Sequence, residues 1–191
     1  METSDFADIL KRRKTHFVLW DLKSPTTRTP QLVIGEFLAG NPPTLTNEKK
    51  HFLKLVSGFS DLWEVSAAEC NLTEGKVYHY WFEVQDTDPE KSPSSPIYVN
   101  EPIAHTVDWR LIAPRLSLPY NEDDRRSASV IKYQRGILVP CDPGGETPDF
   151  AGEPNSNVLP PNNRLVLYEL PTAWSKGSLI SGLESGVGTF A

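Results

Sequence analysis

The alternation in residues 77–85 constrains the fold most, because the stretch reads Val-Tyr-His-Tyr-Trp-Phe-Glu-Val-Gln. Successive side chains of a β-strand point to opposite faces of its sheet, so the pattern predicts a strand with two different faces. The apolar face comprises Tyr78, Tyr80, Phe82 and Val84, and the mixed face comprises Val77, His79, Trp81, Glu83 and Gln85. We therefore expect the first face to lie in a core and the second to be the outer face of the sheet.

A second strand-like run precedes this one. Residues 61–66 read Asp-Leu-Trp-Glu-Val-Ser, and a polar connection containing Gly75 joins them to the strand over 77–85. Two runs rich in aromatic and β-branched residues around such a connection are typical of a β-hairpin with a medium loop. The hairpin is the predicted centre of the chain, with further strands packed around it.

The remaining strands are spaced roughly ten residues apart, with Pro, Gly and Asn turn signals between them. We predict them over 16–22, 31–38, 51–57, 97–99 and 103–112. This spacing indicates a mainly β protein with an immunoglobulin-like β-sandwich, although the Cys-Trp-Cys spacing of true immunoglobulin domains is absent. The expected core includes Val18, Trp20, Ile34, Trp63, Val65, Tyr78, Tyr80 and Phe82.

Residues 1–15 form the predicted N-terminal helical segment, with Ser4 or Asp5 as its cap. The helix ends in the cationic run Lys11-Arg12-Arg13-Lys14. Cations at a helix C-terminus complement the helix dipole in solvent, which is one interpretation of the run. The other is a local contact with a phosphate group.

Composition changes after the sandwich, which we predict over 16–113, and residues 114–191 form an irregular extension. Within it, 128–139 reads as an extended strand or a pair of strands. Residues 141–161 are rich in Gly, Pro, Asp and Asn and indicate a surface loop or linker. Residues 163–170 predict a further strand before a Ser/Gly-rich tail.

Charge and composition exclude several function classes. The chain of 191 residues has a net charge of −6, so no global basic field attracts nucleic acid or anionic lipid. The N-terminus has no apolar signal segment and no run is long enough to span a membrane, which predicts a soluble, cytoplasmic protein without membrane partners. Free, reduced thiols are then expected at Cys70 and Cys141. The four histidines show no metal-ligand spacing and no phosphate-cradling glycine loop is present, so we expect no metal and no cofactor.

Several short motifs resemble the alpha-amylase superfamily. Arg164-Leu-Val-Leu-Tyr-Glu-Leu-Pro171, followed by Gly186-Val-Gly-Thr-Phe190, resembles the entry into the catalytic barrel of these enzymes. Phe17-Val-Leu-Trp-Asp21, and Leu62-Trp-Glu-Val65 with Gly75 to Tyr80, resemble their N-terminal early-set domain. The resemblance runs from about residue 16 to the end and implies an early-set β-sandwich that stops at the start of the barrel.

The departures from that family bear on activity. Pro171 replaces the family histidine, and the chain ends near the first barrel strand, before the strands that carry the family's nucleophile and acid. A retaining glycosidase needs two carboxylates about 5 Å apart. We therefore expect no amylase-type hydrolysis, and a freestanding early-set domain or a cut piece of a longer chain.

Aromatic residues beside polar ones are the candidate ligand-binding groups. Trp81, between His79 and Glu83, is suited to stack on a sugar ring or a base while its neighbours bind the ligand's edge. The alternative is that a second layer, such as the C-terminal tail, covers this face. Trp109 in Asp-Trp-Arg and Tyr168 beside Glu169 are the other candidates. The alternative for Trp109 is a loop anchor with a local ion pair between its neighbours, and that for Tyr168 is an inherited strand without use.

Two functions of different class follow. The first is a non-catalytic module that binds a glucan or another carbohydrate, or serves as an interaction module. The second follows from a resemblance in size and make-up to the ribosome-inactivating proteins of mushrooms, which implies an RNA N-glycosylase that removes an adenine from large-subunit ribosomal RNA. That chemistry needs aromatic stacking, a carboxylate and a cation near the leaving base, for which Glu83, Glu169 and Arg164 are the candidates.

Overall fold

The computed structural model describes residues 3–20, 28–86, 96–114, 126–147, 177–180 and 183–186. The chain divides into two units, Met1–Pro148 and Asp149–Ala191, which are described separately. Within these residues the protein is mainly β, as predicted, with one α-helix, and this helix is too short to cross a membrane. The first unit contains α1 (Thr3–Arg12), β1 (His16–Trp20), β2 (Gln31–Leu38), β3 (Thr44–Phe52), β4 (Lys54–Leu55), β5 (Leu62–Ser66), the short 3₁₀ helix η1 (Ala67–Cys70), β6 (Val77–Gln85), β7 (Pro96–Val99), β8 (Val107–Ile112), β9 (Ser127–Gln134) and β10 (Ile137–Val139).

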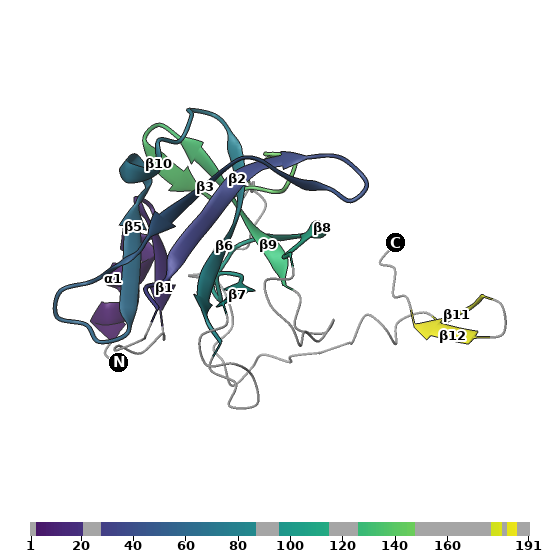
Figure 1. Ribbon diagram of the computed structural model, residues 1–191, viewed down its shortest axis with the longest axis horizontal. Coiled ribbons are helices and arrows are strands. Elements are labelled where there is room, and N and C mark those ends of the chain that lie inside the picture. Colours follow the sequence, from purple (N-terminus) through teal and green to yellow (C-terminus); the bar gives the residue numbers. More distant parts are fainter. Residues whose placement is uncertain are drawn as a thin grey trace, which may run out of the picture. The chain divides into compact units, whose positions relative to one another are not determined.

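Two antiparallel sheets make up the first unit (Figure 1). The smaller sheet has the strand order β1-β5-β4. The larger has the order β10-β9-β6-β2-β3, with β7 also paired to β6 and β8 also paired to β9. Buried side chains from both sheets form one apolar cluster, so the sheets pack face to face as a β-sandwich.

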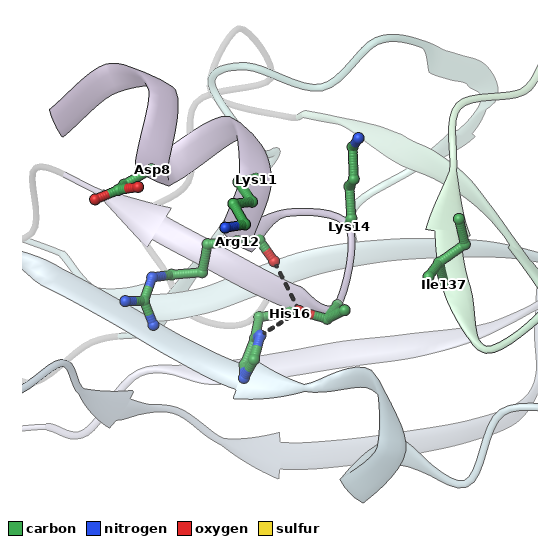
Figure 2. A pocket seen from close by; sticks show the side chains of 7 residues that line it. Asp8, Lys11, Arg12, Lys14, His16 and Ile137 are labelled. Atoms are coloured by element: carbon green, nitrogen blue, oxygen red, sulfur yellow. Dashed lines mark hydrogen bonds between the residues drawn. The ribbon is translucent and has the colours of Figure 1, made fainter. Parts of the chain in front are cut away.

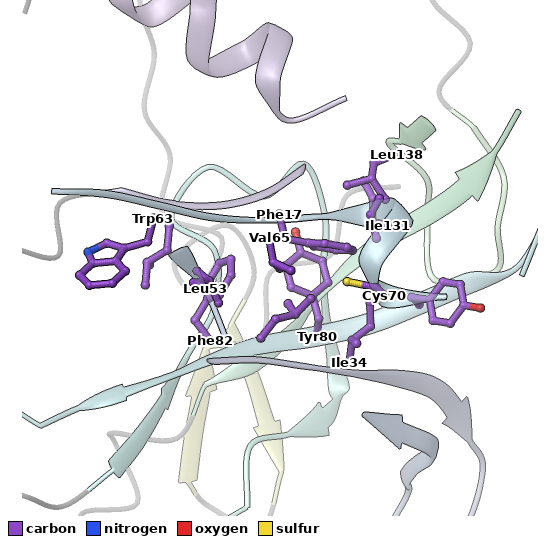
Figure 3. Packing of buried hydrophobic residues seen from close by; sticks show 14 of the residues in the cluster. Phe17, Ile34, Leu53, Trp63, Val65, Cys70, Tyr80, Phe82, Ile131 and Leu138 are labelled. Atoms are coloured by element: carbon purple, nitrogen blue, oxygen red, sulfur yellow. The ribbon is translucent and has the colours of Figure 1, made fainter. Parts of the chain in front are cut away.

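Aromatic and aliphatic side chains from both sheets pack together in the core (Figure 3). Phe17 of β1 meets Tyr80 of β6 edge to face, with ring centroids 5.1 Å apart, and Tyr80 also meets Phe82 at 6.0 Å. The apolar face of β6 therefore lies in the core, as its alternation predicts. The predicted core residues Val18, Ile34, Trp63, Val65, Tyr78, Tyr80 and Phe82 are buried, whereas Trp20 is only partly buried.

The predicted hairpin of residues 61–85 is wrong in its pairing. Both strands exist, but β5 pairs with β1 and β4, whereas β6 pairs with β2, β7 and β9. The connection through η1 therefore crosses from the small sheet to the large one. Alternation shows that a strand has a buried face, but it does not show which sheet provides the strand's neighbours.

Strand β3 begins at Thr44, seven residues before the strand predicted over 51–57. It pairs with β2 in a register that shifts between Ile34 and Glu36, and Asn47 lies in the shifted part with a positive φ of 52°. Gly35 permits this close approach, since a Cβ there would meet the Thr46 carbonyl oxygen at 2.8 Å. The result is a long, polar edge strand with a β-bulge.

The predicted sandwich boundary at residue 113 is also wrong. Strands β9 and β10 belong to the large sheet, where β9 pairs with β6 between Val77↔Lys132 and Tyr80↔Ser129. They form a hairpin, whose two-residue turn is Arg135-Gly136 with φ of 55° and 75°. Positive φ at both central positions is typical of a type I′ hairpin turn. The extended pair expected over 128–139 is thus part of the sandwich.

The segment after α1 joins the two sheets. The Lys14 carbonyl accepts from the Leu138 N–H of β10 at 2.8 Å, and the Thr15 carbonyl accepts from the Ala67 N–H after β5 at 2.9 Å. Lys14 and Thr15 therefore connect β10 of the large sheet to the end of β5 in the small sheet through backbone hydrogen bonds.

Both cysteines are buried and free, as expected. Burial raises the pKa of Cys70 to about 12 and that of Cys141 to about 11, so both thiols stay protonated at neutral pH.

The second unit contributes one hairpin, β11 (Gly177–Ile180) with β12 (Leu183–Gly186). The strand predicted over 163–170 lies outside the described residues.

Candidate functional site

The predicted platform on the second face of β6 is covered. Trp81 is 2% exposed and stacks on Tyr98 of β7 with ring centroids 5.8 Å apart. Its indole N–H donates to the Ser127 carbonyl at 3.0 Å, and Leu111 of β8 belongs to the same cluster. The open platform is therefore wrong and the covered alternative holds, but the cover consists of side chains from neighbouring strands of the same sheet, such as Tyr98 and Leu111.

Glu83, predicted as an edge contact and as a catalytic carboxylate, is 2% exposed and held by two cations. Lys50 Nζ lies 2.7 Å from Oε2, and Arg28 binds Oε1. Burial by itself raises the pKa of Glu83, but the hydrogen bonds from Lys50 and Arg28 outweigh it and lower the pKa below its ordinary value. Glu83 is thus ionised at neutral pH and its charge is already compensated, which suits a structural ion pair.

His79 is fully buried, and its Nε2 lies 2.9 Å from Asp108 Oδ2 of β8. Burial lowers the pKa of His79, although Asp108 acts in the opposite direction. Asp108 is itself buried, but hydrogen bonds from Arg110 and His79 hold its pKa at about 2. At neutral pH a neutral imidazole therefore donates its Nε2–H to an ionised carboxylate.

Asp108 also shapes the backbone of β8. Its Oδ1 accepts from the Arg110 backbone N–H at 3.0 Å, and its two oxygens bind the Arg110 guanidinium at 2.7–3.2 Å. The register between β8 and β9 shifts between Asp108 and Ile112, so the residues between them bulge from the edge of the sheet. Asp108 accepts a hydrogen bond from the backbone N–H two residues further along the chain, and a local contact of this kind stabilises irregular backbone such as this bulge.

Trp109 sits in this bulge and is 68% exposed, more than any other large hydrophobic side chain that the structure describes. Beside it, the Arg110 guanidinium lies over the Phe37 ring at 4.6 Å from the centroid while its side chain remains 58% exposed. The open indole and the anchored guanidinium thus belong to consecutive residues of β8. We call Trp109 and Arg110, held by Asp108, the β8 bulge site.

The structure brings together residues that the sequence kept apart. His79 and Asp108 are in contact, whereas Trp81 and Glu83 belong to the covered face and do not reach the bulge surface. Phe37 and Arg110 were missed as partners, and the available signal was the Asp-x-Arg spacing that permits the turn. Arg164, Tyr168 and Glu169 lie outside the described residues.

No three His, Cys, Asp or Glu side chains are gathered in a way that could hold a metal, within the part of the chain that the structure describes. A search for similar proteins found that no family model, no curated protein and no solved structure matches the chain.

Proposed function

We propose that the sandwich is a non-catalytic carbohydrate-binding module that uses the β8 bulge site. The observation that supports this most directly is the 68% exposure of Trp109 on an ordered bulge. The apolar face of a sugar ring stacks on an indole, and a neighbouring guanidinium donates hydrogen bonds to the ring hydroxyl groups.

Pre-organisation of the site also supports the proposal. Asp108 fixes the Arg110 backbone and side chain together, and Phe37 supports the guanidinium from below. The Arg110 side chain is therefore already restricted, so it would lose less side-chain entropy on binding a ligand.

The early-set resemblance agrees with this function. The resembling stretches 17–20, 62–65 and 77–80 form most of β1, most of β5 and the start of β6, all within the sandwich. Such a domain in an amylase-like enzyme accompanies a glucan substrate, so an α-glucan is the first ligand to test.

The test is affinity electrophoresis in gels that contain soluble starch or glycogen, followed by calorimetric titration with maltoheptaose. We expect glucan to retard the native chain and Trp109→Ala to weaken binding about tenfold or more, because one stacking contact is lost. Phe52→Ala is the matched control, since Phe52 is 64% exposed but lies on β3, separated from β8 by three strands. Both variants should melt like the native chain.

Equal retardation of native chain and Trp109→Ala would exclude the bulge as the binding site. If the native chain shows no retardation with any glucan tested, the carbohydrate proposal itself fails.

A further inference from the structure

A second feature of the first unit is a pocket of about 520 Å³ between the end of α1 and β10. Figure 2 shows Lys14 standing between the helix and Ile137 of β10, with Lys11 on the helix beside it. The lining residues are Asp8, Lys11, Arg12, Lys14, Thr15, His16 and Ile137. The pocket is therefore cationic, although the whole chain carries a net charge of −6.

The four cations of the run 11–14 have two different roles. Arg12 Nη1 lies 2.9 Å from both carboxylate oxygens of Glu64, and Arg13 Nε lies 2.5 Å from Glu101. These two arginines tie the helix to the sandwich. No hydrogen bond or ion pair joins the ammonium group of Lys11 or Lys14 to another residue that the structure describes.

The lysines are not needed to satisfy the end of the helix. The Ile9 carbonyl accepts from the Arg13 N–H at 3.0 Å, and the Lys11 carbonyl accepts from the Lys14 N–H at 3.2 Å. The Arg12 carbonyl accepts from both the N–H and the hydroxyl of Thr15, at 3.0 and 3.3 Å. Because these carbonyl groups already have donors, both ammonium groups are available to a ligand.

An apolar hollow of about 320 Å³ adjoins the cationic pocket. Lys14 and Ile137 line both, and the hollow continues along Leu10, Leu138 and Val139. Leu10 and Ile137 are 43% and 38% exposed, so this apolar surface is open to solvent. Lys14 therefore lies between the cationic pocket and the apolar hollow.

We infer that this composite pocket binds a small phosphomonoester that carries an apolar or aromatic group. A phosphomonoester holds a charge of about −1.5 to −2 at neutral pH, which the two lysine ammonium groups complement. The apolar group of the ligand lies against Leu10 and Ile137. Asp8 is the one acidic residue of the lining, and in Figure 2 it lies on the side of Lys11 away from Lys14, so it borders the anion site from the far end.

Calorimetric titration of the full chain with three probes tests this inference. The probes are 1-naphthyl phosphate, inorganic phosphate and 1-naphthol, which present both groups, the anion alone and the apolar ring alone. We expect 1-naphthyl phosphate to bind about tenfold or more tightly than either part, and less tightly as salt rises from low to high concentration. Ile137→Ser should weaken naphthyl phosphate binding but leave inorganic phosphate binding unchanged.

The double variant Lys11→Gln/Lys14→Gln should lower the affinity for 1-naphthyl phosphate about tenfold or more. Its matched control is Lys54→Gln/Lys76→Gln, which removes the same charge from two exposed lysines outside the pocket. The proposal is overturned if the two double variants bind alike, if naphthol binds as tightly as its phosphate ester, or if no probe binds. Carbohydrate binding by the β8 bulge site is independent of every one of these outcomes.

Discussion

Strand β6 offers a comparison between the two faces of the large sheet. Its inner face packs aromatic and aliphatic side chains into the core between the sheets. Its outer face carries His79, Trp81 and Glu83, which are equally buried. His79 and Glu83 have charged partners, whereas Trp81 packs in a smaller apolar cluster with Tyr98 and Leu111. One strand is therefore buried on both sides, by apolar contact alone on the inner side and by a mixture of apolar contact and ion pairs on the outer side.

The difference teaches how a mixed face can be covered. Each buried carboxylate of the outer face is paired with a cation that still reaches solvent: Lys50 and Arg110 retain 42% and 58% exposure of their side chains. Burying an unpaired charge is costly, whereas a carboxylate whose partner reaches water loses less solvation. The outer face thus tolerates buried carboxylates because their cations remain in contact with solvent.

The largest expected effect is from removing a large side chain on either face. Phe82→Ala and Trp81→Ala should each lower the free energy of unfolding by about 3–5 kcal/mol, because each leaves a cavity in a packed cluster. Urea unfolding followed by circular dichroism measures both. A loss below about 1 kcal/mol for Trp81→Ala alone would show that only the inner face is a true core.

The second effect is a loss of folding stability at acidic pH, caused by Asp108 and His79 on the outer face. The pKa of Asp108 is about 2 in the folded chain and 3.8 when unperturbed, so its charge stabilises the fold above pH 3.8 and the contribution is lost as the pH falls toward 2. This corresponds to about 2 kcal/mol. The lowered pKa of His79 acts in the same direction below about pH 6.5, since the unfolded chain takes up that proton first.

The measurement is the free energy of unfolding of the native chain and of Asp108→Asn between pH 7 and pH 2. The difference between the two should be about 2 kcal/mol at neutral pH and should shrink between pH 4 and pH 2. A difference that stays constant across this range would mean that the substitution acts through packing and not through the carboxylate charge.

Substitutions of the exposed lysines give the smallest effects, and Lys50→Gln is the larger of two. Lys50 binds Glu83 at 2.7 Å and lies over the Tyr98 ring at 5.6 Å, but its side chain is 42% exposed and Arg28 remains with Glu83. We expect a loss of about 1 kcal/mol that diminishes in high salt. Lys54→Gln, which breaks an open pair with Glu69, should cost less. A loss of several kcal/mol on Lys50→Gln would show that Arg28 alone cannot hold the buried carboxylate.

Sequence alone predicts the inner face well. The period of two in 77–85 identifies Tyr80 and Phe82 as core residues, because apolar residues at alternate positions have few other places to go. The same reasoning failed for β3, where residues 44–50 read Thr-Leu-Thr-Asn-Glu-Lys-Lys. An edge strand needs no apolar period, so its strand character comes only from pairing with β2.

The outer face was beyond local pattern. His79 and Glu83 read as solvent-facing because they are polar, and their burial depends on β7 and β8, which follow after residue 95. The candidate site also could not be located from local pattern. The sequence offered both Trp109 and Trp81 as candidate aromatics, but that Trp109 is exposed in a bulge and Trp81 is buried depends on the pairing of β8 in the folded chain.

The two ends of the large sheet bear on whether copies of this chain pair with one another. A strand with free N–H and carbonyl groups invites a neighbouring molecule to extend the sheet, which is how aggregation begins. At one end β10 is three residues long, and its Leu138 N–H is already occupied by the Lys14 carbonyl. At the other, β3 is long, but it carries the Asn47 bulge and the exposed charges of Lys49 and Lys50. Both end strands therefore oppose the addition of a strand from another molecule. In β10 a backbone donor is already bonded, and in β3 the bulge bends the edge and the lysines give it positive charge.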